Sequence, residues 1–148
     1  MTSTGTSTGT STGFSESERA AMKARAEELK VAKGGNKRVK EEQACLDAIA
    51  DMPDADRAIA ERIHAIVLDV APGLAAKTWY GMPAYAEDGK VVCFFKGSAK
   101  FGERYASFGF NEPARLDDGP MWPTAFAVTA VTDEVEKAVA DLVRRAVG

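Results

Sequence analysis

Four aspartates near the end of one predicted helix and the start of the next are the side chains whose type and spacing could bind a hard cation. Asp47 and Asp51 stand four residues apart, and Asp54 and Asp56 follow just beyond Pro53. Hard metal ions prefer carboxylate oxygens, and a bound cation would relieve the repulsion between like charges at i, i+4 on a helix. The alternative is an exposed acidic face that keeps a helix hydrated, with Asp54 capping the next helix. The sequence leaves both interpretations open.

A second candidate site is the aromatic stretch from Lys77 to Tyr85, which reads Lys-Thr-Trp-Tyr-Gly-Met-Pro-Ala-Tyr. Together with Trp122, its rings could line an apolar pocket in which the polar edges of tryptophan and tyrosine orient a ligand. The alternative is that the rings pack in the core between a sheet and helices, as aromatic residues of strands commonly do. The residues predicted to contact a ligand are Trp79, Tyr80, Gly81, Met82, Pro83, Tyr85 and Trp122.

The sequence contains no recognisable catalytic arrangement. It has no nucleophile elbow, no phosphate-binding loop, no zinc-protease motif and no dinucleotide-binding glycine pattern after a strand. The single histidine, His64, lies at the edge of an apolar helical stripe, where a boundary residue is the ordinary interpretation. We therefore predict a protein that is not an enzyme, and the sequence leaves the identity of any cofactor open.

The composition is that of an ordinary globular domain. The 148 residues are 45% hydrophobic and 28% charged, which is enough to build a core without disulfides or metals. The formal net charge of -3 provides no general attraction to nucleic acid, and no apolar run approaches the length of a membrane span. Cys45 and Cys93 match no metal-binding spacing, so we expect a cytoplasmic protein with reduced thiols and no membrane partner.

The first 40 residues are predicted to stand apart from the main domain. Residues 1–13 consist largely of Thr-Ser-Thr-Gly repeats with nothing to bury, so we predict a disordered, dispensable tail. Residues 14–40 are predicted to form a helix, which begins with a capping box at Ser15 and Glu18 and stops at Gly34-Gly35, and then a basic linker. That linker could contact an anionic partner, but no aromatic residues interleave with its charges for base stacking, so a hydrated linker is favoured.

Residues 41–148 are predicted to form the main domain. Apolar periodicity predicts helices over about 40–51 and 55–71, and a last helix that begins at a capping pair, Asp133 and Glu136. Strands are expected near 78–80, 84–86, 91–95, 103–110 and 124–131, with a hairpin turn over residues 87–90. This order indicates an α+β fold with one mainly antiparallel sheet of about five strands, packed by N-terminal helices and a C-terminal helix.

The stretch from Trp79 to Tyr85, with Tyr-Gly-Met-Pro at its centre, resembles the YdhG-like family, which is also catalogued as domain of unknown function 1801. The resemblance covers about residues 43–147 and includes Gly89-Lys90-Val91-Val92 and Phe108-Gly109-Phe110. It implies a compact α+β domain. Some members are described as frataxin-like intracellular iron chaperones, so the resemblance makes iron the cation for the four aspartates. A small molecule is the other partner to consider, and the oligomeric state is open.

Overall fold

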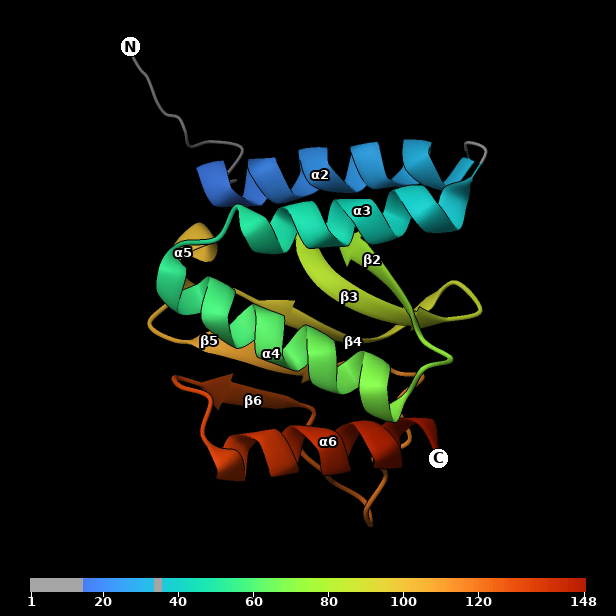
Figure 1. The fold of residues 1–148 in the computed structure, drawn as a ribbon, viewed down its shortest axis with the longest axis vertical. Helices are drawn as coiled ribbons and strands as arrows, with labels where there is room; N and C mark the ends of the chain where they lie inside the picture. Colours follow the sequence, from blue (N-terminus) through green and yellow to red (C-terminus); the bar gives the residue numbers. More distant parts are fainter. Residues whose placement is uncertain (1–14, 34–35) are drawn as a thin grey trace.

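The computed structural model describes residues 15–33 and 36–148 (Figure 1). The predicted tail at 1–13 and the Gly34-Gly35 break lie outside the described residues. The elements in chain order are α2 (Glu16–Lys33), α3 (Lys37–Ala50), α4 (Asp54–Val70), β2 (Ala75–Trp79), β3 (Met82–Glu87), β4 (Lys90–Lys96), α5 (Ser98–Phe101), β5 (Ala106–Phe110), β6 (Ala125–Val128) and α6 (Asp133–Val147). None of the described helices combines the length and the apolar character needed to cross a membrane.

The strands form one sheet in the order β2-β3-β4-β5-β6, and every neighbouring pair is antiparallel. This arrangement confirms the predicted α+β fold. Two tight hairpins join the first three strands, one through Tyr80-Gly81 and the other through Asp88-Gly89. All four turn residues have positive φ, at 52° and 80° in the first turn and 51° and 80° in the second. Such turns match the right-handed twist of the strands that they connect, which explains the register of both hairpins.

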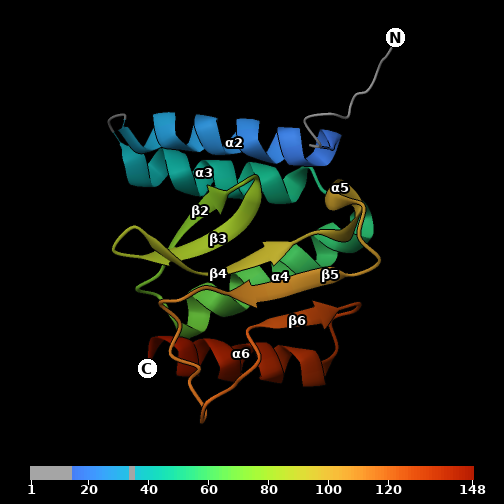
Figure 2. The same cartoon turned by 180° about the vertical axis from the view of Figure 1, so that it is seen from behind.

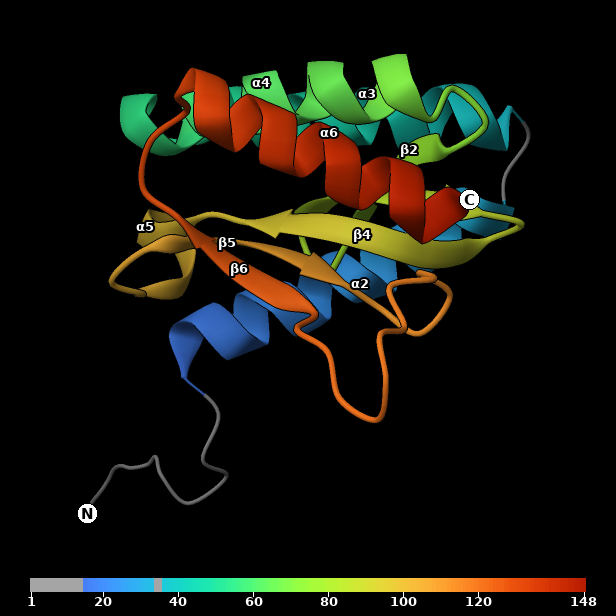
Figure 3. The ribbon, with the colours of Figure 1, turned by 90° about the horizontal axis from the view of Figure 1, so that it is seen from below.

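Three helices cover one face of the sheet and enclose the core. Figure 3 shows α3, α4 and α6 on that face, while α2 runs along the opposite side, and Figure 2 shows the sheet in front of α4. The helices bury an apolar stripe each, represented by Ile49 of α3, Ile63 of α4 and Val143 of α6. Burying an aliphatic side chain of this size stabilises the fold by about 1.5–3 kcal/mol. The core is therefore built between these helices and the inner face of the sheet.

The core contains one tyrosine hydroxyl and two thiols. Tyr85 is wholly buried, and its hydroxyl oxygen lies 2.9 Å from Nδ1 of the half-buried His64. Cys45 and Cys93 are free cysteines with no exposed surface, and burial raises the pKa of each thiol to about 12. The same burial raises the pKa of Tyr85 well above its ordinary value and lowers that of His64. All four groups are therefore neutral at physiological pH and pack as part of the core.

The predicted helix caps are partly right. The capping box at the start of α2 is confirmed, because the amide of Ser15 donates to Oε1 of Glu18 at 2.8 Å and the amide of Glu18 donates to Oγ of Ser15 at 3.1 Å. The prediction for α4 is wrong, since Pro53 occupies the N-cap position and Asp54 lies in the first turn. Its carboxylate accepts a hydrogen bond from Nη2 of Arg57 at 2.6 Å, which competes with a capping role.

Two further boundaries differ from the sequence prediction. Thr132 rather than Asp133 caps α6, through a hydrogen bond from the amide of Val135, and Glu136 instead accepts two hydrogen bonds from Arg62 of α4. Helix α3 begins at Lys37, so the basic residues Lys37, Arg38 and Lys40 belong to this helix instead of a linker. In the first case Glu136 pairs with Arg62 of another helix instead of capping its own. In the second case the helix begins about one turn earlier than the sequence pattern indicated.

Replacing Gly81 by valine should destabilise the protein by about 1–3 kcal/mol, because the residue would be held at positive φ. A Cβ atom at this position would also lie 2.5 Å from Nζ of Lys100. The free energy of unfolding in urea measures the loss. The matched control is Gly89→Val, at the same φ of 80° but with no atom within 4 Å of its Cβ. A loss at Gly81 no larger than that at Gly89 would show that the Lys100 contact has no energetic weight.

Candidate functional site

The outer face of the sheet carries a row of small residues interrupted by one aromatic ring. The strand register places Ala84, Phe94, Gly109 and Ala125 opposite one another across β3, β4, β5 and β6. Residues directly opposite on antiparallel strands lie on the same face. A Cβ atom on Gly109 would overlap the Phe94 ring, so that ring lies directly over the glycine. The small neighbours therefore leave the ring at the centre of a shallow hollow.

Two more aromatic rings extend this platform. The ring centroids of Trp79 and Phe94 are 5.2 Å apart with the planes inclined by 52°, and Tyr80 meets Trp79 edge to face at 5.1 Å. The guanidinium of Arg25, on α2, lies 5.7 Å from the centroid of the Tyr80 ring. The edge-to-face geometry of Trp79 and Tyr80 is a favoured one for aromatic pairs. Trp79 and Phe94 are half-buried, so part of each ring is available to a ligand.

A cavity of about 430 Å³ lies over this platform, which we call the outer-face cavity. Apolar side chains make up its floor, and Lys96 lies at its edge, where its Nζ is 3.0 Å from Oε2 of Glu103. The first turns of α2 close one side. The lining consists of Ser17, Glu18, Ala21, Trp79, Met82, Phe94, Lys96, Phe101, Glu103, Ser107, Gly109 and Ala125. An apolar hollow with a few polar groups at its edge is typical of a small-molecule site.

The structure brings only part of the predicted aromatic site together. Trp79 and Met82 line the outer-face cavity, and Gly81 borders a neighbouring groove. Tyr80 exposes about a third of its surface, whereas Tyr85 is wholly buried. Pro83 is also buried, and Trp122 lies in the loop between β5 and β6, where it lines a separate hollow with Phe110 and Leu116.

Sequence reasoning missed Phe94 and Phe101 as cavity residues. Residues 91–95 form a nearly continuous apolar run, and such a run does not reveal which side chain faces outward. The register supplies that information, because the irregularity between Tyr85 and Ala86 sets which residues of β4 face the helices. The one local signal was that Phe94 stands two residues before the charged Lys96, which places both side chains on the same face of a strand.

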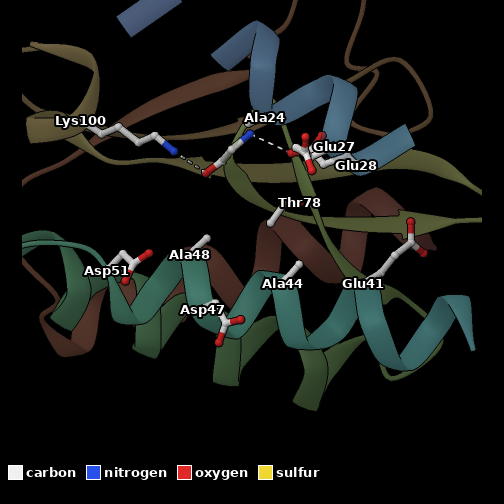
Figure 4. A pocket seen from close by; sticks show the side chains of 11 residues that line it. Ala24, Glu27, Glu28, Glu41, Ala44, Asp47, Ala48, Asp51, Thr78 and Lys100 are labelled. Atoms are coloured by element: carbon white, nitrogen blue, oxygen red, sulfur yellow. Dashed lines mark hydrogen bonds between the residues drawn. The ribbon is translucent and has the colours of Figure 1, made fainter. Parts of the chain in front are cut away.

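A second hollow, of about 360 Å³, lies between α2 and α3 and is called the α2–α3 groove here. Figure 4 shows Asp47 and Asp51 on α3, Glu27 and Glu28 on α2, and Lys100 approaching from α5. Two of the four predicted metal-binding aspartates, Asp47 and Asp51, therefore share this groove.

The other two predicted aspartates have structural partners. Asp54 pairs with Arg57 on the surface. Asp56 is 5% exposed and accepts hydrogen bonds at 2.9 Å from both Oγ of Ser98 and the amide of Ala99. Its carboxylate thus binds the start of α5. Within residues 15–33 and 36–148, no three His, Cys, Asp or Glu side chains lie close enough together to hold a metal ion.

One buried carboxylate fixes α2 to the sheet. Glu28 is 8% exposed and accepts hydrogen bonds from the amides of Tyr80 at 3.0 Å and Gly81 at 2.9 Å. Among residues 16–30, whose side-chain burial the structure describes, Glu28 alone is buried. Nζ of Lys100 donates to the carbonyl oxygen of Gly81 at 3.2 Å, on the other side of the turn. This Glu28 clasp therefore positions α2 against both hollows.

Comparisons with known proteins do not assign the chain to a group. No family model matches it, and no curated protein or solved structure proved similar. The function must accordingly be inferred from the geometry of the two hollows.

Replacing Glu28 by glutamine should destabilise the protein by about 1–3 kcal/mol, because the new amide group turns an N–H donor toward one of the two backbone donors. Amide hydrogen exchange at Tyr80 and Gly81 should also become faster. The control is Glu27→Gln on the same turn of α2. The Glu27 side chain is 63% exposed, and its ion pair with Lys30 is a long one, with 3.8 Å between its Oε1 and Nζ of Lys30. Unchanged exchange at both amides in Glu28→Gln would contradict the role of the clasp.

Proposed function

We propose that the protein is a non-catalytic binding protein, and that the outer-face cavity takes a small ligand with a flat apolar ring. The observation that carries the proposal is the aromatic platform of Trp79 and Phe94 within this cavity. The solvent-facing side of an antiparallel sheet is ordinarily polar. Half-buried aromatic rings above a row of small residues are better suited to packing against another ring than to contact with water.

The edge of the cavity indicates which substituent such a ligand would carry. Lys96 faces Glu103 at 3.0 Å and also lies 5.2 Å from the centroid of the Phe101 ring. Both members of the ion pair are partly exposed, so the pair contributes little stability and can open at small cost. An anionic group on the ligand would then replace Glu103 as the partner of Lys96, while the ring stacks on Phe94.

The cellular setting forms part of the same proposal. We propose a cytoplasmic protein, which agrees with two cysteines that are free and buried. We also propose membership of the YdhG-like family, on the basis of Tyr80-Gly81-Met82-Pro83 and the segments around it.

An aromatic anionic dye, anilinonaphthalene sulfonate, tests the cavity. In a Trp122→Phe background, which leaves Trp79 as the reporter, the dye should quench tryptophan fluorescence as it binds. Ala125→Leu should weaken this binding at least tenfold by filling the hollow, since Ala125 is an exposed lining residue. Ala127→Leu is the control, because Ala127 lies opposite Ser107 on the same face and outside the cavity lining. Equal binding by the two leucine variants would remove the cavity from consideration.

Iron handling is the second candidate function. The observation in its favour is that Asp47 and Asp51 line one groove together with other carboxylates. Since the described residues offer no three-ligand cluster, any iron bound there would be held weakly by surface carboxylates and water.

Ferrous ion titrated under anaerobic conditions tests this candidate. Asp47→Asn combined with Asp51→Asn should reduce iron binding at least fivefold, whereas Asp54→Asn alone should leave it unchanged. Asp56 is not substituted, because its carboxylate holds the start of α5. Calorimetry gives the affinities, and a double variant that binds iron as well as the wild type would exclude the groove as the iron site.

A further inference from the structure

The α2–α3 groove has the dimensions and the walls of a site for a slender chain. Ala24 of α2 faces Ala44 and Ala48 of α3 across the hollow, with Thr78 at its floor (Figure 4). Methyl groups are the smallest apolar side chains, so they leave a channel of about 360 Å³ between two helices without a bulky side chain to fill it. Methylene groups of a ligand would be stabilised on leaving water for such walls.

The charges around this channel are mostly negative. Its lining includes five carboxylates, namely Glu27, Glu28, Glu41, Asp47 and Asp51, and one ammonium, that of Lys100. Lys100 lies at the end next to Gly81, where its Nζ already donates to the carbonyl oxygen of that residue. Glu28 is engaged by the hairpin turn, whereas Asp47 receives, from the residues that the structure describes, a single hydrogen bond, donated by the side-chain amide of Gln43 at 2.9 Å. The channel is therefore suited to cations.

Glu41 provides an independent sign that a donor is missing. The residue is 9% exposed, and its Oε2 is buried without a hydrogen-bond partner among the described residues. Nζ of Lys77 lies 3.4 Å from this oxygen, so the two groups form an ion pair, but their geometry is not that of a hydrogen bond. A buried acceptor left without a donor is unfavourable, because it has lost its hydrogen bonds to water. An N–H group that enters the groove would satisfy it.

The spacing of the carboxylates favours an extended polycation over a single metal ion. Glu41, Asp47 and Asp51 follow one another along α3, and at 1.5 Å per residue the first and last are about 15 Å apart along the axis. No three ligating side chains among the described residues converge on one point. Several charges separated by apolar linkers would match both the spread of the carboxylates and the alanines between them.

We propose that the α2–α3 groove binds a linear aliphatic polyamine, whose ammonium groups donate to Glu41, Asp47 and Asp51 and whose methylenes pack against Ala24, Ala44 and Ala48. Ammonium-to-carboxylate hydrogen bonds are charge-assisted and are stronger than neutral ones. This site is separate from the outer-face cavity. It shares Asp47 and Asp51 with the iron candidate and names a different class of cation.

Calorimetry with spermidine on the 148-residue chain tests the proposal, at about 0.15 M salt so that distant surface charges are screened. The wild type should bind spermidine at least tenfold more tightly than butylamine, which carries one charge, and more tightly than magnesium ion. Asp47→Asn with Asp51→Asn should weaken spermidine binding at least tenfold. The charge-matched control is Asp54→Asn with Asp118→Asn, two exposed positions outside the groove lining, which should change the affinity less than twofold.

Three results from the affinity measurements would overturn the polyamine site. They are an absence of spermidine binding by the wild type, an equal loss in the two double variants, and equal affinity for magnesium and spermidine. The site can be located independently of affinity, because spermidine should shift the amide resonances of Thr78 and Gly81 in the wild type. Shifts confined to residues outside the groove would equally contradict the proposal. The iron titration with the same variants remains a separate result, since ferrous ion can fail to bind while spermidine binds.

Discussion

The hairpin turn at Tyr80 and Gly81 is the point on which the outer half of the structure depends. Both residues hold the left-handed conformation, which is costly for a residue with a side chain such as Tyr80. That conformation directs two backbone donors to one side, where the Glu28 carboxylate accepts both. Lys100 holds the carbonyl oxygen of Gly81 on the other side. A helix far away in sequence and the short helix α5 therefore both bind the backbone of one two-residue turn.

The two faces of the sheet are held by different forces. On the inner face, α3, α4 and α6 bury aliphatic side chains, and this burial supplies most of the stability of such a domain. On the outer face, α2 contributes a polar clasp and small side chains, and both hollows border it. Regions with few buried apolar contacts open at lower free energy than the core. The placement of both candidate sites beside α2 follows from this difference in packing.

Local patterns in the sequence predicted the elements well but not the contacts between them. The hairpin at residues 87–90 and the capping box at Ser15 depend on neighbours in the chain, and both are present as predicted. Glu28 and Gly81 are 53 residues apart, and Asp56 and Ala99 are 43 apart, so no local motif could pair them. A carboxylate on a helix looks the same in the sequence whether it is hydrated, caps another helix or clasps a turn.

The same limit applies to the candidate sites. The aromatic stretch was predicted as one candidate site, yet its rings divide between the core, the outer-face cavity and the surface, because successive residues of a strand point to opposite faces. Trp79 faces outward and Tyr85 inward. The aspartates divide for a similar reason, since residues beyond Pro53 belong to a second helix with its own direction. Which residues converge is decided by register and helix packing, neither of which can be read from one strand or helix alone.

The two buried thiols can report on local opening of the fold. Cys45 lies on α3 and Cys93 on β4, and neither has surface that a reagent in solution could reach. Because a pKa of about 12 keeps both sulfurs protonated in the closed fold, attack requires the helix layer to separate from the sheet. The rate of thiol labelling in the native protein therefore measures how often the layer of α3, α4 and α6 opens away from the sheet. Movements of α2 alone, on the outer face, would leave the rate of thiol labelling unchanged.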